Sequence, residues 1–287
     1  MRFLMLDGCC CRLRSADDLF RGNGDVMLKE QTLFGLVDKV AIAIERLQHF
    51  EPPEGYYLAF SGGKDSIVIK ELAVLAKIKH DSHYSVTSID PPELVRFIRT
   101  FPEVSWERPE VALLTKLVTQ GFPQRQRRWC CELYKENGGN DRCVITGIRS
   151  AESYNRSRRK VYEHCYSGGY KSKNKTFMNP IIDWTDDDVW AFIKERKLPY
   201  CSLYDEGWKR IGCLFCPMAG KQRLVAAERY PLYVRAFVRA FERLYRRLKE
   251  KQSASIDRWA SGEEMFWWWL KEDRKSEDKG QKKMVFE

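Results

Sequence analysis

A short polar hexapeptide, SGGKDS at residues 61–66, separates two apolar segments and constrains the fold more than any other part of the chain. The stretch YYLAF (56–60) precedes it and is typical of a buried strand. The segment that follows, residues 67–78, is apolar on nearly all sides and predicts a buried helix. A strand, a glycine turn and a helix in this order predict the opening of a βαβ unit.

The alternation of predicted strands and helices continues along the chain. Residues 85–90 and 142–148 are predicted strands, and FMNPIIDW (177–184) contains a further extended segment. Apolar residues recur at helical spacing over residues 30–50, which predicts an amphipathic helix. This order of elements indicates an α/β fold with a doubly wound, mainly parallel sheet.

A capping pattern marks the start of another predicted helix. Thr185 is followed by Asp186, Asp187 and Asp188, and a helical pattern then continues to Leu198. A threonine cap and acidic side chains in the first turn both stabilise a helix N-terminus. The three carboxylates are therefore interpreted as structural.

Changes in composition divide the chain into four predicted parts. Beyond residue 200 the alternation gives way to loops and to a long helix over residues 228–251 that is rich in Arg, Phe and Tyr. The parts are an irregular N-terminal extension with Cys9, Cys10 and Cys11 (1–26), a nucleotide-binding α/β domain (27–200), a C-terminal helical lobe with a CxxC motif (201–272) and a disordered charged tail (273–287).

The chain is basic, with 50 Lys and Arg residues against 40 Asp and Glu, a formal net charge of +10. Such a balance favours polyanionic partners, nucleic acid first, with a basic solvated surface as the alternative. No apolar run is long enough to cross a bilayer and no hydrophobic signal core begins the sequence, so we expect a cytoplasmic location. In that reducing compartment the 10 cysteines are expected to bind metal or to take part in catalysis.

The hexapeptide has the residues of a phosphate-binding loop. Gly62 and Gly63 allow a sharp turn and a close approach of the backbone to a ligand. Backbone amides at the following helix N-terminus would face an anion. Ser61, Lys64 and Ser66 could bind or neutralise phosphate oxygens. The glycine spacing differs from the Walker GxxxxGK[ST] pattern, and the alternative is a plain glycine turn.

The sequence resembles a known family of ATP-cleaving enzymes. SGGKDS is similar to the PP-loop signature SGGxDS of the ATP pyrophosphatases, which are adenine nucleotide alpha-hydrolase-like proteins. SIDPPEL (88–94), TGIRSAES (146–153), NPIIDWTDDDVW (179–190) and IGCLFCPM (211–218) together resemble the phosphoadenosine-phosphosulfate reductase-like branch. The resemblance implies that the loop grips the pyrophosphate end of ATP and that AMP is transferred to an oxygen, with Mg²⁺ neutralising the phosphates.

The resemblance also implies roles for particular residues. Lys64, Asp65 and Arg149 would be catalytic, and Asp65 would help to place Mg²⁺. Asp90 would lie near the adenosine at a strand end. Arg149 could bind two phosphate oxygens through its fork, with a surface ion pair as the alternative. The implied nucleotide-binding set is Ser61, Gly62, Gly63, Lys64, Asp65, Ser66, Asp90 and Arg149, with Ser153 and Arg156 as weaker candidates.

Two pairs of cysteines form the second candidate site. Cys130 and Cys131 are adjacent, and Cys213 and Cys216 form a C-x-x-C motif. This pattern resembles sulfonucleotide reductases that bind a [4Fe–4S] cluster through four cysteines, a usual ligand number for such clusters. The arginines of RQRR (125–128) could offset the cluster charge or bind phosphates. A Cys₄ zinc site and free thiols are the alternatives.

Two departures from the reductases direct the functional prediction. Reductases have an altered loop and a nucleophilic cysteine near the C-terminus, whereas SGGKDS is intact here and no cysteine follows Cys216 in the sequence. We therefore expect an ATP-dependent, pyrophosphate-releasing sulfurtransferase with an iron–sulfur cluster. DNA phosphorothioation is the favoured reaction, supported by the basic runs RSRRK (156–160) and KSKNK (171–175) and by the Arg-rich helix.

Several alternatives remain at this point. The chain could be a tRNA thiolation enzyme, a sulfonucleotide reductase, or a non-catalytic iron–sulfur or zinc subunit of a DNA-modifying complex. The expected partners are nucleic acid, a sulfur donor such as a cysteine desulfurase, and other subunits of a modification complex. No membrane partner is expected.

Overall fold

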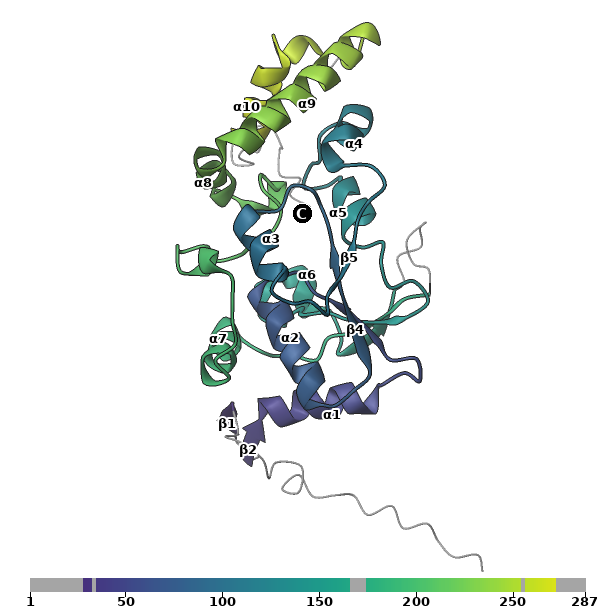
Figure 1. The fold of residues 1–287 in the computed structure, drawn as a ribbon, viewed down its shortest axis with the longest axis vertical. Helices are drawn as coiled ribbons and strands as arrows, with labels where there is room; N and C mark the ends of the chain where they lie inside the picture. The colour runs from purple at the N-terminus through teal and green to yellow at the C-terminus, as the bar shows by residue number, and fades with distance from the viewer. Residues whose placement is uncertain (1–27, 33–34, 166–173, 254–255, 272–287) are drawn as a thin grey trace, which may run out of the picture.

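The computed structural model describes residues 28–32, 35–165, 174–253 and 256–271 (Figure 1). The predicted N-terminal extension with its three cysteines, the predicted charged tail and most of the KSKNK run lie outside the described residues. Among the described helices, none combines the length and the apolar character that a membrane crossing requires.

A six-stranded sheet organises the fold, in the order β5-β4-β3-β6-β8-β7. All neighbouring strands run parallel except the β7–β8 pair, which is antiparallel. The predicted α/β class with a mainly parallel sheet is therefore confirmed. The strands are β3 (Tyr56–Ala59), β4 (His80–Ser85), β5 (Ser105–Glu107), β6 (Cys143–Ile145), β7 (Tyr162–His164) and β8 (Thr176–Met178).

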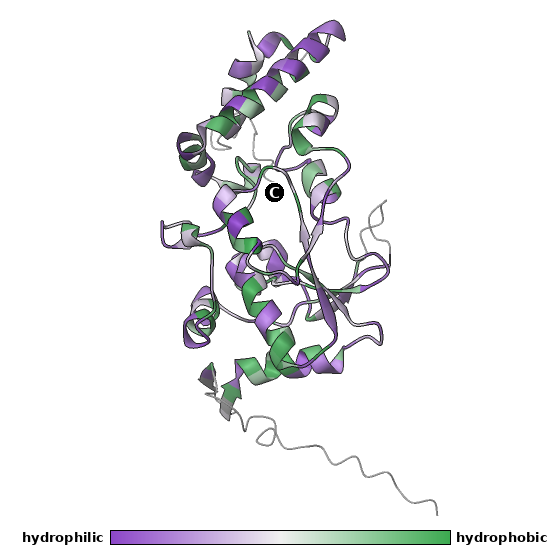
Figure 2. Ribbon diagram, viewed as in Figure 1, coloured by the Kyte–Doolittle hydropathy of each residue, from purple (hydrophilic) through white to green (hydrophobic). Residues whose placement is uncertain are grey.

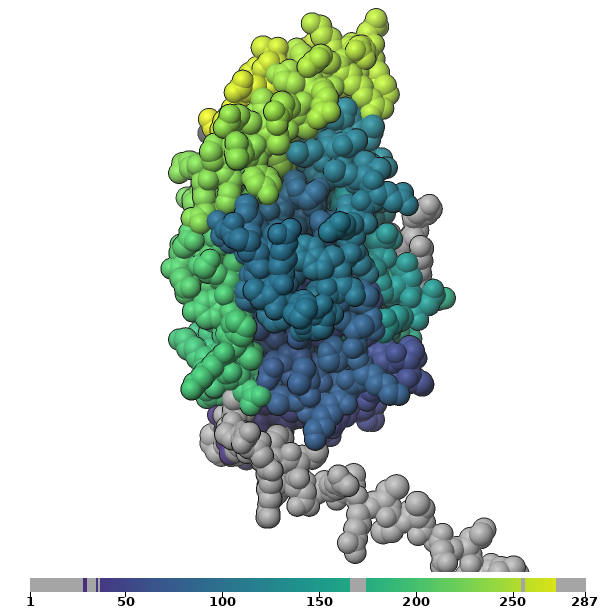
Figure 3. Space-filling view, viewed as in Figure 1, coloured from purple at the N-terminus to yellow at the C-terminus, as the bar shows by residue number. Residues whose placement is uncertain are grey.

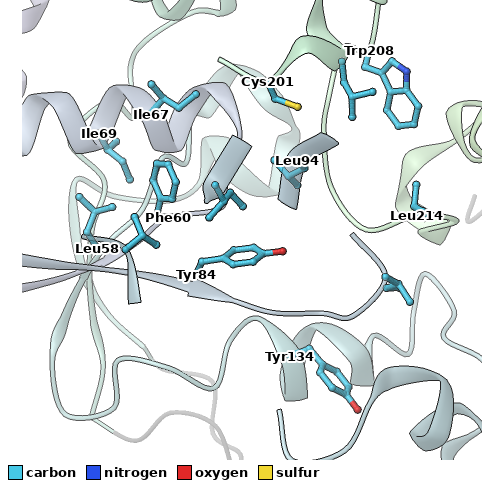
Figure 4. Packing of buried hydrophobic residues seen from close by; sticks show 14 of the residues in the cluster. Leu58, Phe60, Ile67, Ile69, Tyr84, Leu94, Tyr134, Cys201, Trp208 and Leu214 are labelled. Atoms are coloured by element: carbon cyan, nitrogen blue, oxygen red, sulfur yellow. The ribbon is translucent and has the colours of Figure 1, made fainter. Parts of the chain in front are cut away.

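One face of the sheet packs against helices that precede, connect and follow its strands. They include α1 (Lys39–His49), α2 (Lys64–Leu75), α3 (Pro92–Ile98) and α7 (Asp186–Glu195), with α2 in contact with both α1 and α7. Leu58 and Phe60 lie beneath Ile67 and Ile69 of α2, and all four are almost completely buried (Figure 4). This packing fixes the loop between β3 and α2, because both of its ends are anchored in the core.

The opposite face of β3 contacts the loop of residues 135–142. Side chains alternate along a strand, so Tyr57 points away from α2 and stacks on His83 of β4 with ring centroids 4.1 Å apart. A Cβ atom at Gly138 would lie 2.1 Å from the Tyr57 hydroxyl oxygen, so only glycine allows the loop to approach this closely.

The C-terminal helices form a lobe together with a helix from the first half of the chain. They are α8 (Gln222–Arg229), α9 (Pro231–Glu250) and α10 (Gly262–Lys271); α8 and α10 pack against α9, and α9 packs against α4 (Leu113–Gln120) (Figures 1 and 3). Phe122 stacks on Phe241 of α9, and the Trp269 indole donates a hydrogen bond of 2.7 Å to the Pro123 carbonyl oxygen. α9 is amphipathic, with hydrophilic and hydrophobic residues interleaved along it (Figure 2).

Two predicted helix starts and one predicted strand are misplaced. The helix predicted from residue 30 begins at Lys39, after an antiparallel hairpin of β1 (Lys29–Thr32) and β2 (Gly35–Asp38). The Asp38 carboxylate accepts hydrogen bonds from two amides of the first turn and so starts the helix there. The long C-terminal helix begins at Pro231, because Tyr230 has non-helical backbone angles.

The strand predicted over residues 85–90 is also misplaced. The structure forms β4 from the polar segment His80–Ser85 instead. Ser82 and Tyr84 are buried on one face, while Asp81 and His83 occupy the other and bind each other there. Even the buried face of this strand contains a serine, so the segment lacks the apolar alternation that predicts a strand.

Candidate active site

The structure gathers most of the predicted nucleotide-binding residues around one cavity of about 490 Å³. It lies at the carboxyl ends of β3, β4 and β6, where ligands bind in open α/β sheets. The predicted residues that line it are Ser61, Gly63, Lys64, Asp65, Ser66, Asp90 and Arg149.

Gly62 has a different role from the other loop residues. Its φ angle is +70°, and a Cβ atom there would lie 2.7 Å from side-chain atoms of Leu94 and Ile98 on α3. Glycine at this position allows the turn and the close packing of α3, so Gly62 shapes the loop rather than lining the cavity.

The first amide of α2 is directed at a polar partner. The Lys64 backbone amide donates a hydrogen bond of 2.9 Å to the hydroxyl oxygen of Tyr204, which lies in a short 3₁₀ helix (Ser202–Tyr204). Burial raises the pKa of Tyr204, so this hydroxyl stays neutral. Its oxygen occupies a position in which a helix N-terminus would also accept a phosphate oxygen. Tyr204 was not predicted as a site residue.

A network of four charged side chains surrounds the loop. Arg149 is 2% exposed and donates to Asp65 Oδ1 at 2.7 Å and to Asp186 Oδ1 at 2.8 Å. Lys64 Nζ lies 3.0 Å from the same Asp186 oxygen. Arg149 is therefore buried between two carboxylates, which excludes the alternative of a surface ion pair.

The three aspartates that begin α7 do not share one role. Asp188 forms the predicted capping box with Thr185 and pairs with Lys39 at 2.8 Å. Asp186 instead reaches Lys64 and Arg149 in the cavity, so the structural interpretation is wrong for this residue. Burial raises the Asp186 pKa, but the two cations outweigh burial and hold it below its usual range.

Asp90 lies in the loop after β4 and is 5% exposed. Its carboxylate accepts hydrogen bonds from the Tyr84 hydroxyl at 2.6 Å and from the Thr87 hydroxyl at 2.7 Å. These donors fix the carboxylate at the rim of the cavity. Of the two weaker candidates, Arg156 lines the cavity and pairs with Glu152, whereas Ser153 caps the short helix α6 (Tyr154–Ser157).

The four predicted cysteine ligands line one small cavity of about 40 Å³. Cys130 and Cys131 come from α5 (Trp129–Tyr134), and Cys213 and Cys216 come from the loop before residue 217. Phe237 of α9 and Trp269 of α10 also line this cavity, so the helical lobe contributes part of its wall. Two segments that are distant in sequence are thus brought together as the resemblance implied.

The pKa values of the cysteine thiols are shifted in different directions. Hydrogen bonds from the Cys130 thiol and from Arg128 lower the pKa of Cys131 to about 5, and the same contact raises the pKa of Cys130. Burial raises the pKa of Cys213 to about 11. Within the described residues, no three His, Cys, Asp or Glu side chains are arranged to hold a single metal ion.

Lys135 connects the two sites and was also missed. It lines the nucleotide cavity and the cysteine cavity. The Cys213 sulfur, followed by the Asp90 carboxylate, holds the pKa of its ammonium group above the ordinary value. The sequence did contain a signal for Lys135. It lies four residues after Cys131, which is about one helical turn, so the two side chains could be expected on the same side.

A family model for the phosphoadenosine phosphosulfate reductase domain matches residues 55–219, more than half of the 287-residue chain. The chain belongs to this family. The match contains the phosphate-binding loop, Arg149 and all four cysteines, whereas Phe237 and Trp269 at the cysteine cavity lie outside it.

Named relatives have more than one activity. An uncharacterized protein of Methanocaldococcus jannaschii is 31% identical over 56% of this chain and 35% of its own length. A probable FAD synthase of Schizosaccharomyces pombe is 27% identical over 63% of this chain and 69% of its own. The crystal structure of a phosphoadenylyl-sulfate reductase from Candida auris covers 60% of this chain and 87% of its own, at 21% identity and a TM-score of 0.47.

The chain thus spans about a third of the length of the Methanocaldococcus relative. The predicted membership in the PP-loop and phosphoadenosine-phosphosulfate reductase-like group is confirmed.

The contact between Gly147 and Asp65 gives a first prediction. A Cβ atom at Gly147 would lie 2.9 Å from Asp65 Cβ and 3.0 Å from its carbonyl oxygen, so Gly147→Ala must displace the first turn of α2. We expect ATP to bind about tenfold more weakly, or ~1.4 kcal/mol, in titration calorimetry. Gly212→Ala is the control, because Gly212 lines the same cavity with no atom within 4 Å of its Cβ position. Equal losses in both variants would contradict the assignment of the loop.

The Asp186 contacts give a second prediction. Asp186→Asn removes the negative charge that Lys64 and Arg149 share, so both cations become available to an anion. We expect pyrophosphate, titrated without Mg²⁺, to bind several-fold more tightly. Asp187→Asn on the exposed side of the same turn is the matched control and should leave the affinity unchanged. Weaker binding by Asp186→Asn would show that this carboxylate does not compete with phosphate.

Proposed function

We propose that this chain is an ATP-dependent sulfurtransferase that activates an oxygen of a nucleic acid and replaces it with sulfur, with a DNA phosphate as the favoured acceptor. The observation that carries the proposal is the juxtaposition of two cavities through Lys135. One has the intact phosphate-binding loop and the other has four cysteines. The first suits adenylation and the second suits sulfur chemistry.

The first step of the proposed reaction needs groups that hold pyrophosphate as it leaves. A non-bridging oxygen of the acceptor attacks the α-phosphorus of ATP, the bond to the β-phosphate breaks, and pyrophosphate departs. Lys64, Arg149 and the amides at the start of α2 would bind the negative charge that develops there. Asp65 and Asp186 are carboxylates of the kind that bind Mg²⁺ beside phosphates.

In the second step sulfide attacks the activated acceptor and AMP leaves. Sulfide displaces AMP without any change of oxidation state, so no external oxidant or reductant is needed. Lys135 would hold an anionic sulfur species or a phosphate at the boundary of the two cavities. A [4Fe–4S] cluster, when bound by these cysteines, would supply sulfide-bridged iron beside the nucleotide cavity.

The cysteine cavity fits such a cluster better than a single zinc ion. Four thiols line one apolar cavity, which matches the ligand number of a cluster. Adjacent cysteines can each bind a different iron of a cluster, whereas a single zinc ion requires all four ligands to converge on one point. Arg128 and Lys135 lie close enough to Cys131 and Cys213 to offset negative charge.

The charge distribution supports a nucleic acid as the acceptor. Arg235, Arg239 and Arg243 of α9 are exposed, and their four-residue spacing places them along one side of the helix. Their spacing is about 6 Å along the helix axis. A row of this kind suits contacts with a sugar–phosphate backbone, so binding should weaken as salt rises.

A sulfonucleotide reductase is the second candidate function. The matched family is named after this activity, and a four-cysteine cavity beside a nucleotide cavity is compatible with it. Reduction of an adenylyl sulfate releases sulfite and AMP and leaves no pyrophosphate. Product analysis with ATP and with adenylyl sulfates therefore separates the two reactions.

The third prediction concerns ATP cleavage. Lys64→Ala should lower nucleic-acid-stimulated pyrophosphate release by at least 100-fold, because it removes the buried ammonium group at the loop. Lys70→Ala, on the same helix but paired with Glu103 outside the cavity, is the matched control and should retain the rate. Wild-type pyrophosphate release by Lys64→Ala would contradict the catalytic assignment of this loop, and no release by the wild type itself would make the chain a binding subunit.

The fourth prediction concerns the cysteines. Protein purified without oxygen should contain about four iron atoms per chain and absorb near 400 nm, as iron–sulfur charge transfer does. Cys213→Ser should lose most of the iron. Cys165→Ser should retain it, because Cys165 lies at a different cavity. Stoichiometric zinc in the anaerobic protein would contradict the cluster.

A further inference from the structure

A second large cavity, of about 530 Å³, lies on the face of the sheet opposite α2. Its floor includes Tyr57 of β3, Val144 of β6 and Phe177 of β8. The strand register pairs Tyr57 with Val144 and Val144 with Phe177, so the three side chains form one row across the sheet. We call this space the sheet-face cavity.

The sheet-face cavity adjoins the nucleotide cavity. Ala59, Ser85, Lys135 and Ile148 line both. Ala59 and Ser85 end β3 and β4, where the nucleotide is expected. A molecule in one cavity can therefore touch a molecule in the other at this boundary.

Charged side chains at the sheet-face cavity have partners of their own. Arg159 pairs with Glu163. Lys175 is 4% exposed and donates to two backbone carbonyl oxygens of the 135–142 loop. Among the described residues, Lys135 is the one cation that lines both cavities. This distribution favours an uncharged group inside the sheet-face cavity and an anion at its boundary with the nucleotide cavity.

Planar side chains, Tyr57, Phe177 and Arg159, contribute to the wall of the sheet-face cavity. The Tyr57 ring is held nearly parallel to His83, at an interplanar angle of 9°. The Arg159 guanidinium lies 5.1 Å from the centroid of the Phe177 ring. Aromatic faces and planar guanidinium groups both stack favourably on flat rings, so these side chains are compatible with a planar ligand.

We propose that the sheet-face cavity binds the planar heteroaromatic ring of the acceptor. The phosphate of the same acceptor would then lie at Lys135, against the α-phosphate of ATP. This inference rests on the proposed adenylyl transfer and specifies its acceptor. An oxygen of the acceptor phosphate attacks the α-phosphorus of ATP, and pyrophosphate leaves. A nucleotide whose base is unstacked from its strand has this chemistry, and so does a free mononucleotide such as FMN.

Filling the cavity tests the proposal. Val144→Trp places a large ring on the cavity floor. Val74→Trp is the matched control, because Val74 is 53% exposed on α2 and lies at none of the three cavities. Both variants and the wild type are titrated, with a non-hydrolysable ATP analogue bound, against FMN, labelled single-stranded DNA, the same strand made of abasic nucleotides, and the matching RNA.

We expect the wild type to bind at least one ring-bearing probe ten times more tightly than the abasic strand. Val144→Trp should remove this preference, and Val74→Trp should keep it. Affinity for the ATP analogue should stay within twofold in both. A preference for DNA or RNA identifies a nucleic acid strand as the source of the ring, and a preference for FMN alone identifies a small phosphate.

Three results would overturn the proposal: no preference in the wild type, an undiminished preference in Val144→Trp, or an equal loss of affinity for the ATP analogue. Phe177→Leu provides a second variant that keeps an apolar side chain and removes the flat ring, and a several-fold loss of ring binding is expected. The proposed function fails separately, through the absence of pyrophosphate release, and that result leaves the binding of the ring unaffected.

Discussion

The buried guanidinium of Arg149 is the interaction on which the site depends. It joins the segment after β6 to α2 through Asp65 and to α7 through Asp186. Removing one partner from a buried ion pair costs about 3–5 kcal/mol, because the remaining charge stays desolvated. The positions of the loop, of α7 and of the end of β6 are therefore interdependent. Lys64 joins the same group through Asp186, so the cations expected to bind phosphate are held in place before any ligand arrives.

The sequence predicted the parts of this site that follow from strand and helix order. The βαβ pattern placed Lys64 and Asp65 at a helix N-terminus, and the strand after residue 142 placed Arg149 beside them, because parallel strands end at the same edge. The meeting of the cysteine pairs came from a resemblance, since nothing in their spacing indicates which loops fold together.

Other parts of the site could not be predicted for physical reasons. Asp186 belongs to a run of three aspartates at a helix start, and all three satisfy the pattern of a cap. Only the packing of α7 against α2 shows that one of them turns toward Lys64. Tyr204 reaches the loop from a short 3₁₀ helix, which has no period that a pattern could detect. β4 was misplaced because one of its faces is polar, and that face contacts a loop instead of a helix.

The position and charge of Lys135 bear on all three cavities. Among the described residues, it is the one that lines the nucleotide, cysteine and sheet-face cavities together. It follows α5 directly, so the helix that carries Cys130 and Cys131 also sets the position of this ammonium group. Its charge is already shared with Cys213 and Asp90. Any change in charge at the cysteines therefore alters the field where phosphate oxygens are expected, because one cation serves both. In the proposed reaction, this one cation would couple sulfur chemistry to adenylyl transfer through electrostatics alone.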